Sequence, residues 1–140
     1  MLTLFPASWA MKAGARLTTE RVALAVDDEE LVCHLTARIL SDAGFRVIEA
    51  HSGDEAIALL GTLAPDGIDL VVSDIAMPGM TGVQLAAKIA TQWPAVPVLL
   101  VSGHGGPDSG YQGSFLPKPF TPEALLSAVS ALLPKSAHIA

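Results

Sequence analysis

The sequence predicts an α/β protein with an open, five-stranded parallel sheet and helices on both faces of that sheet. Two observations support this fold class. Short apolar runs of strand length alternate along the chain with segments whose apolar residues recur at helical spacing. Of the 140 residues, 51% are hydrophobic and only 16% are charged, which favours one domain with a well-filled aliphatic core. Strands that alternate with helices form parallel β–α units, which make the sheet doubly wound.

The first β–α unit begins with the apolar run at 21–26, which predicts a buried strand. Four acids follow at 27–30, where their negative charge favours the start of a helix. Gly44 is expected to end this helix, and Cys33 is expected to be an inert structural thiol within it. The apolar stripe expected on the helix consists of Leu31, Val32, Leu35, Ile39 and Leu40.

The second unit begins with a strand predicted at 46–50. Ser52 opens the next helix, and Glu55, three residues later, completes a capping-box pattern. The Pro-Asp-Gly sequence at 65–67 predicts a turn after that helix. The residues expected to be buried on this helix are Ala56, Ile57, Leu59 and Leu60.

The third unit begins with a strand predicted at 68–73, which stops at Asp74. After a short loop, Thr81 or Gly82 begins the third helix. The residues expected to be buried on this helix are Val83, Leu85, Ala86 and Ile89.

The last part of the chain contains a fourth strand at 97–101 and a short fifth strand at 115–116. Thr121 followed by Pro122 is a strong helix start, with Thr at the N-cap and Pro at the first helical position. Leu125, Val129 and Leu132 form the apolar stripe expected on this helix. The organised domain is therefore expected to span 21–134, with residues 1–20 and 135–140 as terminal tails.

Residues 103–113 separate the fourth and fifth strands and contain five glycines and one proline. Within a helix, Gly costs about 1 kcal/mol and Pro about 3 kcal/mol relative to Ala. We therefore expect no regular helix here, so that the fourth helix of the fold is degenerate.

Composition and charge exclude several classes of protein. The longest unbroken apolar runs, 22–26 and 56–60, are far shorter than the roughly 20 residues of a membrane-spanning helix. The first residues lack the basic start of a signal peptide, and Pro6 interrupts them. A single cysteine allows no internal disulfide and suits a reducing cytoplasm. The net charge of −6 argues against a nucleic-acid partner.

Polar side chains follow the strand ends, where ligands bind in open α/β sheets. Asp27 and Asp28 follow the first strand, Asp74 the third, Ser102 the fourth and Lys118 the fifth. Three carboxylates and one ammonium leave a charge of −2, which favours a bound cation. Oxygen ligands without a His or Cys partner favour a hard ion, Mg²⁺ over Zn²⁺. Without that cation, an incoming phosphate would meet a repulsion of about 4 kcal/mol per close charge pair.

Four sequence pieces in this order resemble the receiver domain of a two-component response regulator: VDDEE at 26–30, SDIAMPGMTG at 73–82, LLVSG at 99–103 and LPKPFTPEALL at 116–126. The resemblance covers about 21–134 and implies a flavodoxin-like fold. A shortened fourth helix resembles what is seen in receivers attached to hybrid sensor kinases and in some stand-alone regulators. The chain could therefore be a stand-alone protein or part of a hybrid kinase.

The resemblance implies a phosphoacceptor role for Asp74, which would take a phosphoryl group from a phosphohistidine of a sensor histidine kinase or of a histidine phosphotransfer protein. It implies that Lys118 binds the phosphoryl group, with a cis peptide bond before Pro119. Ser102 and Phe115 would form the conformational switch that changes partner binding. The Mg²⁺ ligands implied by the resemblance are Asp27, Asp28, Asp74 and the backbone carbonyl of Ala76.

Two other functions fit the sequence less well. A Mg²⁺-dependent phosphohydrolase with an aspartyl nucleophile would carry the sequence D-x-D-x-T after a strand, and its second Asp would supply a proton. Ala76 occupies that second position in this sequence. A dinucleotide-binding protein needs a glycine-rich phosphate cradle after its first strand, whereas acids stand here at 27–30.

Overall fold

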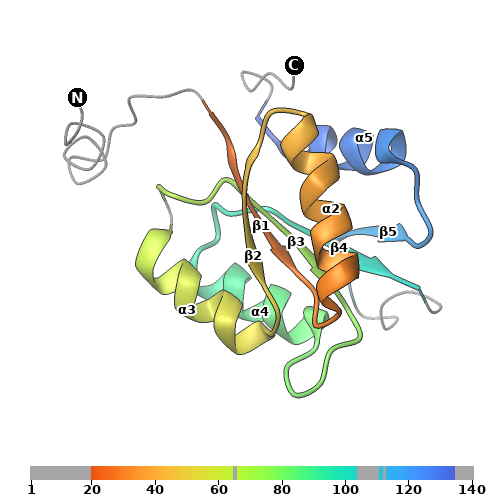
Figure 1. Ribbon diagram of the computed structural model, residues 1–140. Coiled ribbons are helices and arrows are strands. Elements are labelled where there is room, and N and C mark those ends of the chain that lie inside the picture. Colours follow the sequence, from red (N-terminus) through yellow and green to blue (C-terminus); the bar gives the residue numbers. More distant parts are fainter. Residues whose placement is uncertain (1–19, 65, 104–110, 112, 135–140) are drawn as a thin grey trace.

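The computed structural model describes residues 20–64, 66–103, 111 and 113–134. Within this part of the chain, five strands form one sheet in the order β2-β1-β3-β4-β5 (Figure 1). All four neighbouring pairs are parallel. The predicted open, parallel five-stranded sheet is therefore confirmed.

The strands are β1 (Val22–Val26), β2 (Arg46–Ala50), β3 (Leu70–Asp74), β4 (Val98–Ser102) and β5 (Ser114–Pro117). The helices are α2 (Glu30–Asp42), α3 (Gly53–Leu63), α4 (Gly82–Gln92) and α5 (Pro122–Leu132). The third strand begins two residues later than expected, and it includes Asp74 as its last residue. Likewise, β4 extends by one residue to include Ser102.

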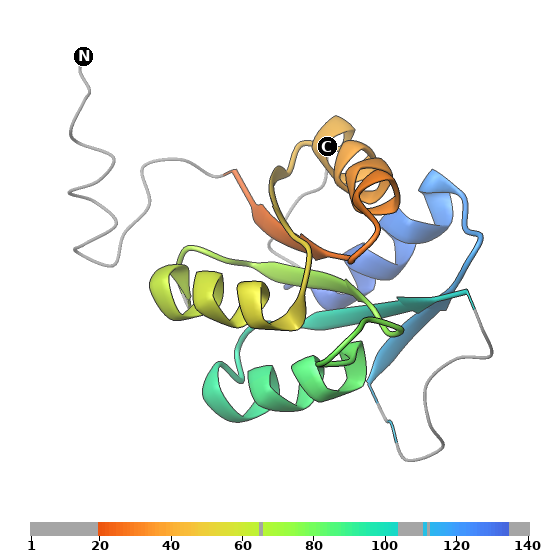
Figure 2. The same cartoon turned by 60° about the horizontal axis from the view of Figure 1, so that its bottom comes forward.

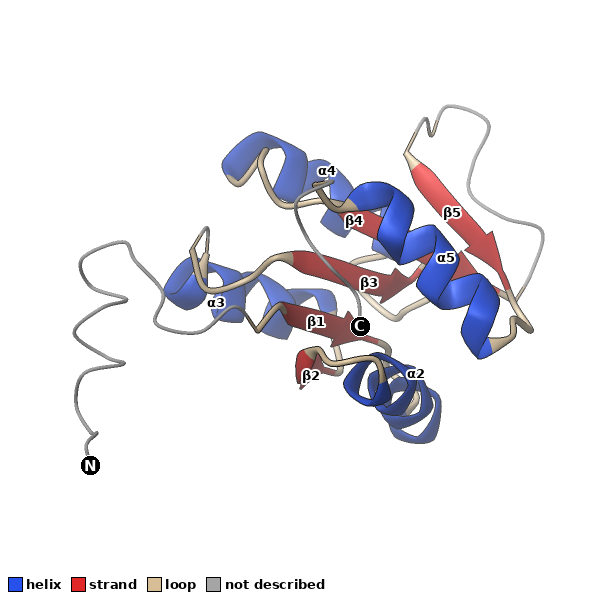
Figure 3. Ribbon diagram, turned by 90° about the horizontal axis from the view of Figure 1, so that it is seen from above, coloured by secondary structure: helices blue, strands red, loops and turns tan. Residues whose placement is uncertain are grey.

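The helices cover both faces of the sheet, with α3 and α4 on one face and α2 and α5 on the other (Figures 2 and 3). Side chains alternate between the two faces along a strand, so neighbouring residues of β1 belong to different cores. Leu24 packs in the core beneath α3 and α4, whereas Ala23 packs in the core beneath α2 and α5. The central strand β3 is buried along its whole length because helices cover it from both sides.

The predicted helix starts are confirmed by their capping hydrogen bonds. The side-chain oxygens of Ser52, Thr81 and Thr121 each accept a hydrogen bond from the backbone N–H three residues later. Oε1 of Glu55 accepts a hydrogen bond from the backbone N–H of His51, one residue before the cap. Gly44, which was expected to end α2, has a φ of 106° that favours glycine. These caps fix where each helix leaves the edge of the sheet.

The predicted buried face of α2 is wrong at Leu31 and Leu35, whereas Leu40 is buried as expected. Leu31 is 81% exposed and Leu35 is 64% exposed. The helix lies against the backbone of the sheet, since the Sγ atom of Cys33 is 3.4 Å from the carbonyl oxygen of Ala25. Such a close approach favours small side chains over leucine. The residues of α2 that are buried are Cys33, Thr36, Ala37 and Leu40.

Several expectations fall on residues outside the described part of the chain. Residues 104–110 and 112, most of the segment between β4 and β5, are among them, so the degenerate fourth helix remains a prediction. The same holds for the proposed tails at 1–19 and 135–140. Among the helices that the structure describes, none has the length and apolar character needed to cross a bilayer.

Candidate functional site

The polar residues predicted at the strand ends lie at the carboxyl edge of the sheet. Asp74 and Ser102 are the last residues of β3 and β4. Asp27 follows the end of β1, and Lys118 follows the end of β5. Parallel pairing places these four ends side by side, because β1 and β4 both flank β3 and β5 flanks β4.

Three carboxylates meet at this edge. One oxygen from each of Asp27, Asp28 and Asp74 lies within 4.8 Å of the other two. Asp27 and Asp74 are buried, whereas Asp28 is exposed and keeps the cluster open to solvent. The predicted convergence of these three acids is confirmed.

Lys118 pairs with two of the three carboxylates. Its Nζ atom lies 3.1 Å from Oδ1 of Asp74 and 3.2 Å from Oδ2 of Asp27. Its backbone N–H donates to the carbonyl oxygen of Ser102 at 2.7 Å, which fixes its start point beside β4. The bond between Lys118 and Pro119 is cis, as the sequence resemblance implies. The ammonium of Lys118 therefore lies between Asp27 and Asp74.

The charges in this cluster shift each other's protonation. Burial raises the pKa of Asp74, and the nearby carboxylates of Asp27 and Asp28 raise it further, although Lys118 opposes both effects. Burial alone would lower the pKa of Lys118, but its hydrogen bonds and attraction to Asp74 and Asp27 outweigh this and raise it. The cluster thus carries more negative charge than its one lysine balances, which favours a bound cation.

The backbone holds Asp27 in a fixed orientation. Its Oδ1 atom accepts a hydrogen bond from the backbone N–H of Glu29 at 3.0 Å. Its own N–H donates to the carbonyl oxygen of Ala50 at 3.1 Å. Its carbonyl oxygen lies 3.2 Å from Nδ1 of His51. Consequently the end of β1 is tied to the end of β2 beside it.

His51, which lies beside this cluster, was not identified from the sequence. The signal that would have found His51 is its position directly after β2, the strand that pairs with β1. A residue at that position must lie beside the residue that follows β1.

The other candidate residues lie in the loop after β3 and on strands β4 and β5. Ala76 is exposed in the loop between Asp74 and α4, where Met77 is buried. Ser102 is buried at the end of β4. Phe115 is partly buried on β5, opposite Leu100 of β4.

The donor atoms of the cluster suit a hard divalent cation. Carboxylate oxygens are the ligands that Mg²⁺ prefers, usually together with a carbonyl oxygen and water. The thiol of Cys33 is unsuited to be a ligand, because burial raises its pKa to about 12 and its Sγ atom faces the backbone of the sheet. The residues present therefore fit Mg²⁺.

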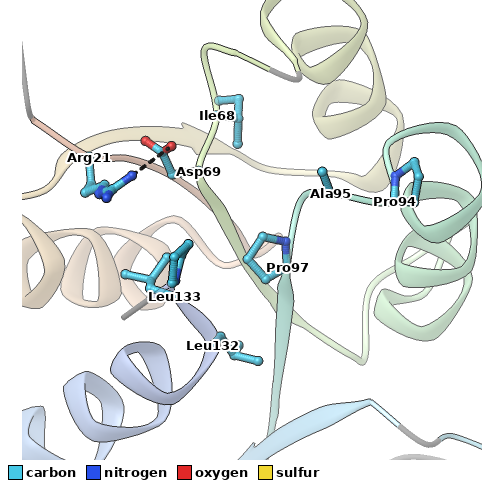
Figure 4. Close-up of a pocket in the computed structure, with 9 residues that line it drawn as sticks. Arg21, Ile68, Asp69, Pro94, Ala95, Pro97, Leu132 and Leu133 are labelled. Carbon is cyan, nitrogen blue, oxygen red and sulfur yellow. Dashed lines mark ion pairs between the residues drawn. The ribbon is translucent and has the colours of Figure 1, made fainter. Parts of the chain in front are cut away.

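A separate cavity of about 280 Å³ lies at the amino edge of the sheet, away from the acids (Figure 4). Arg21, Asp69 and Pro97, which line it, directly precede β1, β3 and β4. Nη1 of Arg21 pairs with Oδ1 of Asp69 at 3.7 Å in the lining of this cavity. It shares no residue with the acidic cluster.

Comparison with known proteins gives a consistent result. The model of the response regulator receiver domain family matches residues 23–130. The transcriptional regulatory protein GlrR of Escherichia coli is 38% identical over 120 residues, which are 81% of this chain and 26% of GlrR. The sensor kinase CckA of Brucella abortus is 33% identical over 125 residues, which are 85% of this chain and 13% of CckA. The chain thus matches only a small part of each of these relatives.

Two solved structures show the same fold. The receiver domain of the hybrid histidine kinase CckA has a TM-score of 0.68 and 35% identity, covering 81% of this chain and 99% of that one. The response regulator receiver protein of Sinorhizobium medicae has a TM-score of 0.72 and 34% identity, covering 81% of this chain and 94% of that one.

Proposed function

Because the chain belongs to the receiver domain family of two-component response regulators, we propose that it accepts a phosphoryl group on Asp74 in a Mg²⁺-dependent reaction. The observation that carries the proposal is the position of Asp74. Its carboxylate lies at the end of the central strand, beside two further acids and in direct contact with Lys118. This arrangement supplies a nucleophile, ligands for a cation and a positive group for phosphoryl oxygens.

In the proposed reaction, an oxygen of the Asp74 carboxylate attacks the phosphorus of a donor phosphohistidine. The phosphorus–nitrogen bond breaks, its electron pair returns to the imidazole of the donor, and an acyl phosphate forms on Asp74. Lys118 already lies 3.1 Å from Oδ1 of Asp74, so it is placed to pair with the transferred oxygens.

A bound Mg²⁺ would neutralise negative charge on the phosphoryl oxygens during this transfer. We propose Asp27, Asp28, Asp74 and the backbone carbonyl of Ala76 as the groups that hold the ion. Asp28 is exposed, so it leaves an open side through which a donor can approach.

The conformational response is proposed to involve Ser102 and Phe115. Ser102 ends β4, which pairs with β3, and its carbonyl oxygen accepts a hydrogen bond from the backbone N–H of Lys118. We propose that the Ser102 hydroxyl group moves to bind the transferred phosphoryl group. A movement of Ser102 toward that group would be transmitted along the paired strands β4 and β5 to Phe115.

The proposed donors are a sensor histidine kinase or a histidine phosphotransfer protein in the cytoplasm, and the proposed output is altered binding of a protein partner. A phosphohydrolase remains disfavoured as an alternative, because Ala76 provides no proton donor. Self-catalysed transfer to one aspartate would distinguish a receiver from an enzyme that turns over many substrate molecules.

The proposal is tested by incubating the protein with a small-molecule phosphodonor such as acetyl phosphate, with and without Mg²⁺. We expect one phosphoryl group per chain with Mg²⁺ and none after chelation. Asp74→Asn should abolish incorporation. The matched control is Asp69→Asn, which changes a carboxylate near the opposite end of β3 and should leave incorporation intact. Equal labelling of Asp74→Asn and the unmodified protein would refute the proposal.

A further inference from the structure

A contact between α3 and the loop after β3 lies beside the acidic cluster. Gly53, the first residue of α3, is buried. A Cβ atom at this position would lie 2.7 Å from Sδ, 2.8 Å from Cβ and 2.9 Å from Cγ of Met80. The side chain of Met80 therefore occupies the space that any side chain at residue 53 would need.

Met80 belongs to the loop that joins Asp74 to α4. It directly precedes Thr81, the N-cap of α4. Met77 of the same loop is buried in the core cluster that includes Ala56 of α3, and Met80 packs against that cluster. The two methionines thus hold the loop against α3, with Ala76 beside the first of them.

The segment that leads into α3 also contacts Asp27, which follows β1. Ala50 accepts a hydrogen bond from the N–H of Asp27, and His51 lies against the carbonyl oxygen of Asp27. Ser52 and Glu55 fix the first turn of α3 through their capping hydrogen bonds. One short segment, 50–53, therefore contacts both Asp27 and the loop that follows Asp74.

We propose that Gly53 is a positioning residue for the acidic cluster: the space left by its missing side chain receives Met80 and thereby sets the position of loop 75–81 relative to Asp27 and Asp74. This inference rests on the proposed function for its consequence, since the loop carries the carbonyl of Ala76 that we assign to Mg²⁺.

The geometry predicts that a side chain at residue 53 displaces the loop. Rotation of the Met80 side chain can move its Sδ and Cγ atoms, but its Cβ atom is attached to the backbone of the loop. A methyl group at residue 53 would lie 2.8 Å from that Cβ atom, so the loop itself must move. Mg²⁺ requires near-ideal octahedral ligand geometry, so a displaced ligand weakens its binding.

The test compares Gly53→Ala with Gly61→Ala. Both glycines are in α3, but a Cβ atom at Gly61 would meet nothing within 4 Å, so Gly61→Ala makes the same chemical change without the contact to Met80. We expect Gly53→Ala to raise the dissociation constant for Mg²⁺ about tenfold or more, and Gly61→Ala to leave it unchanged. Without Mg²⁺, backbone amide NMR signals of residues 75–81 should shift in Gly53→Ala and not in Gly61→Ala.

A second pair of variants separates positioning from general damage. In the double variant, Gly53→Ala adds a Cβ atom to the helix and Met80→Gly removes one from the loop. We expect this double variant to bind Mg²⁺ more tightly than Gly53→Ala alone, although Met80→Gly alone binds it more weakly than the unmodified protein. Were Gly53→Ala to fail to fold, Met80→Ala, which withdraws Cγ and Sδ from the same space, should still weaken Mg²⁺ binding.

The inference is overturned if Gly53→Ala folds and binds Mg²⁺ within twofold of the unmodified protein. It is also overturned if Met80→Ala leaves binding unchanged. In either case a normal phosphoryl transfer to Asp74 would leave the proposed function standing. If the unmodified protein neither bound Mg²⁺ nor accepted a phosphoryl group, the proposed function would fail, and the amide signals of 75–81 would still decide whether Gly53 positions the loop.

Discussion

Gly82 lies directly against the backbone of Asp74. A Cβ atom at Gly82 would overlap the carbonyl oxygen of Asp74 and would lie 2.8 Å from Cα of Ile75. The N–H of Gly82 also donates to the carbonyl oxygen of Ile75 at 2.9 Å. The first residue of α4 is therefore packed on the strand end that presents the Asp74 side chain.

This contact predicts that Gly82→Ala destabilises the protein by about 2 to 4 kcal/mol, because both colliding groups belong to the backbone. Urea denaturation measures the change in the free energy of unfolding. Gly61→Ala serves as the control, and it should stabilise α3 by about 0.5 to 1 kcal/mol because its Cβ atom meets open space. Similar stabilities for the two variants would show that Gly82 is not closely packed.

Lys118 is predicted to hold the acidic cluster together when no cation is bound. Lys118→Met keeps the length of the side chain but leaves Asp27 and Asp74 buried without a positive partner. Breaking a buried pair costs about 3 to 5 kcal/mol, and because Lys118 is 20% exposed we expect about 2 kcal/mol. Urea denaturation at pH 7 without Mg²⁺ measures this loss.

A control for that prediction adds Asp74→Asn to Lys118→Met. Removing one carboxylate reduces the repulsion that the first change exposes, so the double variant should be more stable than Lys118→Met alone. Equal or lower stability of the double variant would contradict the pairing described here.

The stability of the Mg²⁺-free protein is predicted to depend on the ionisation of Asp74. Its pKa is raised in the folded state, mainly by burial, so the fold favours the protonated form. The resulting stability is fully present below the unfolded pKa of about 4 and is lost as the pH rises through the folded pKa. Asp74→Asn should therefore be more stable than the unmodified protein at pH 7, by on the order of 1 kcal/mol, and this advantage should fade toward pH 4.

Mg²⁺ should reverse that order at pH 7. At a hundredfold excess over its dissociation constant, the ion should stabilise the unmodified protein by about 2.7 kcal/mol. It should stabilise Asp74→Asn much less. Urea titrations at pH 4 and pH 7, with and without Mg²⁺, provide both comparisons, and an advantage of Asp74→Asn that is equal at both pH values would argue against the raised pKa.

The strand ends and helix starts could be predicted because they depend on local sequence. Asp27 and Asp74 interrupt apolar runs, and Thr81 and Thr121 cap helices with bonds to residues three positions away. Parallel topology then requires the carboxyl ends of the strands to share one edge of the sheet, so the cluster around Asp74 could be predicted from the sequence.

Contacts between distant segments could not be predicted in this way. The meeting of Gly53 with Met80 and of His51 with Asp27 depends on how β2 lies beside β1 and how α3 lies on the sheet. On α2, Leu40 is buried as predicted, but Leu31 and Leu35 are exposed although helical spacing places them on the apolar stripe. The close approach at Cys33 places small side chains against the sheet instead.

The corrected face of α2 predicts unequal effects of two leucine substitutions. Leu35 is 64% exposed, so Leu35→Gln should change the free energy of unfolding by no more than about 0.5 kcal/mol. Leu40 is fully buried, so Leu40→Ala should cost about 2 to 5 kcal/mol. Thermal or urea unfolding distinguishes the two variants. A loss of stability from Leu35→Gln as large as that from Leu40→Ala would contradict the exposed position of Leu35.

The central claim is that Asp74 becomes the acyl phosphate, and the most direct test locates the phosphoryl group on the chain. Reduction with borohydride converts an aspartyl phosphate into homoserine, which marks the position in a form that survives peptide mass spectrometry. After treatment with acetyl phosphate and Mg²⁺, we predict homoserine at residue 74, and none in protein incubated without the donor. Homoserine at Asp27 or Asp28 in place of Asp74, or phosphate carried by a histidine or serine instead, would contradict the account.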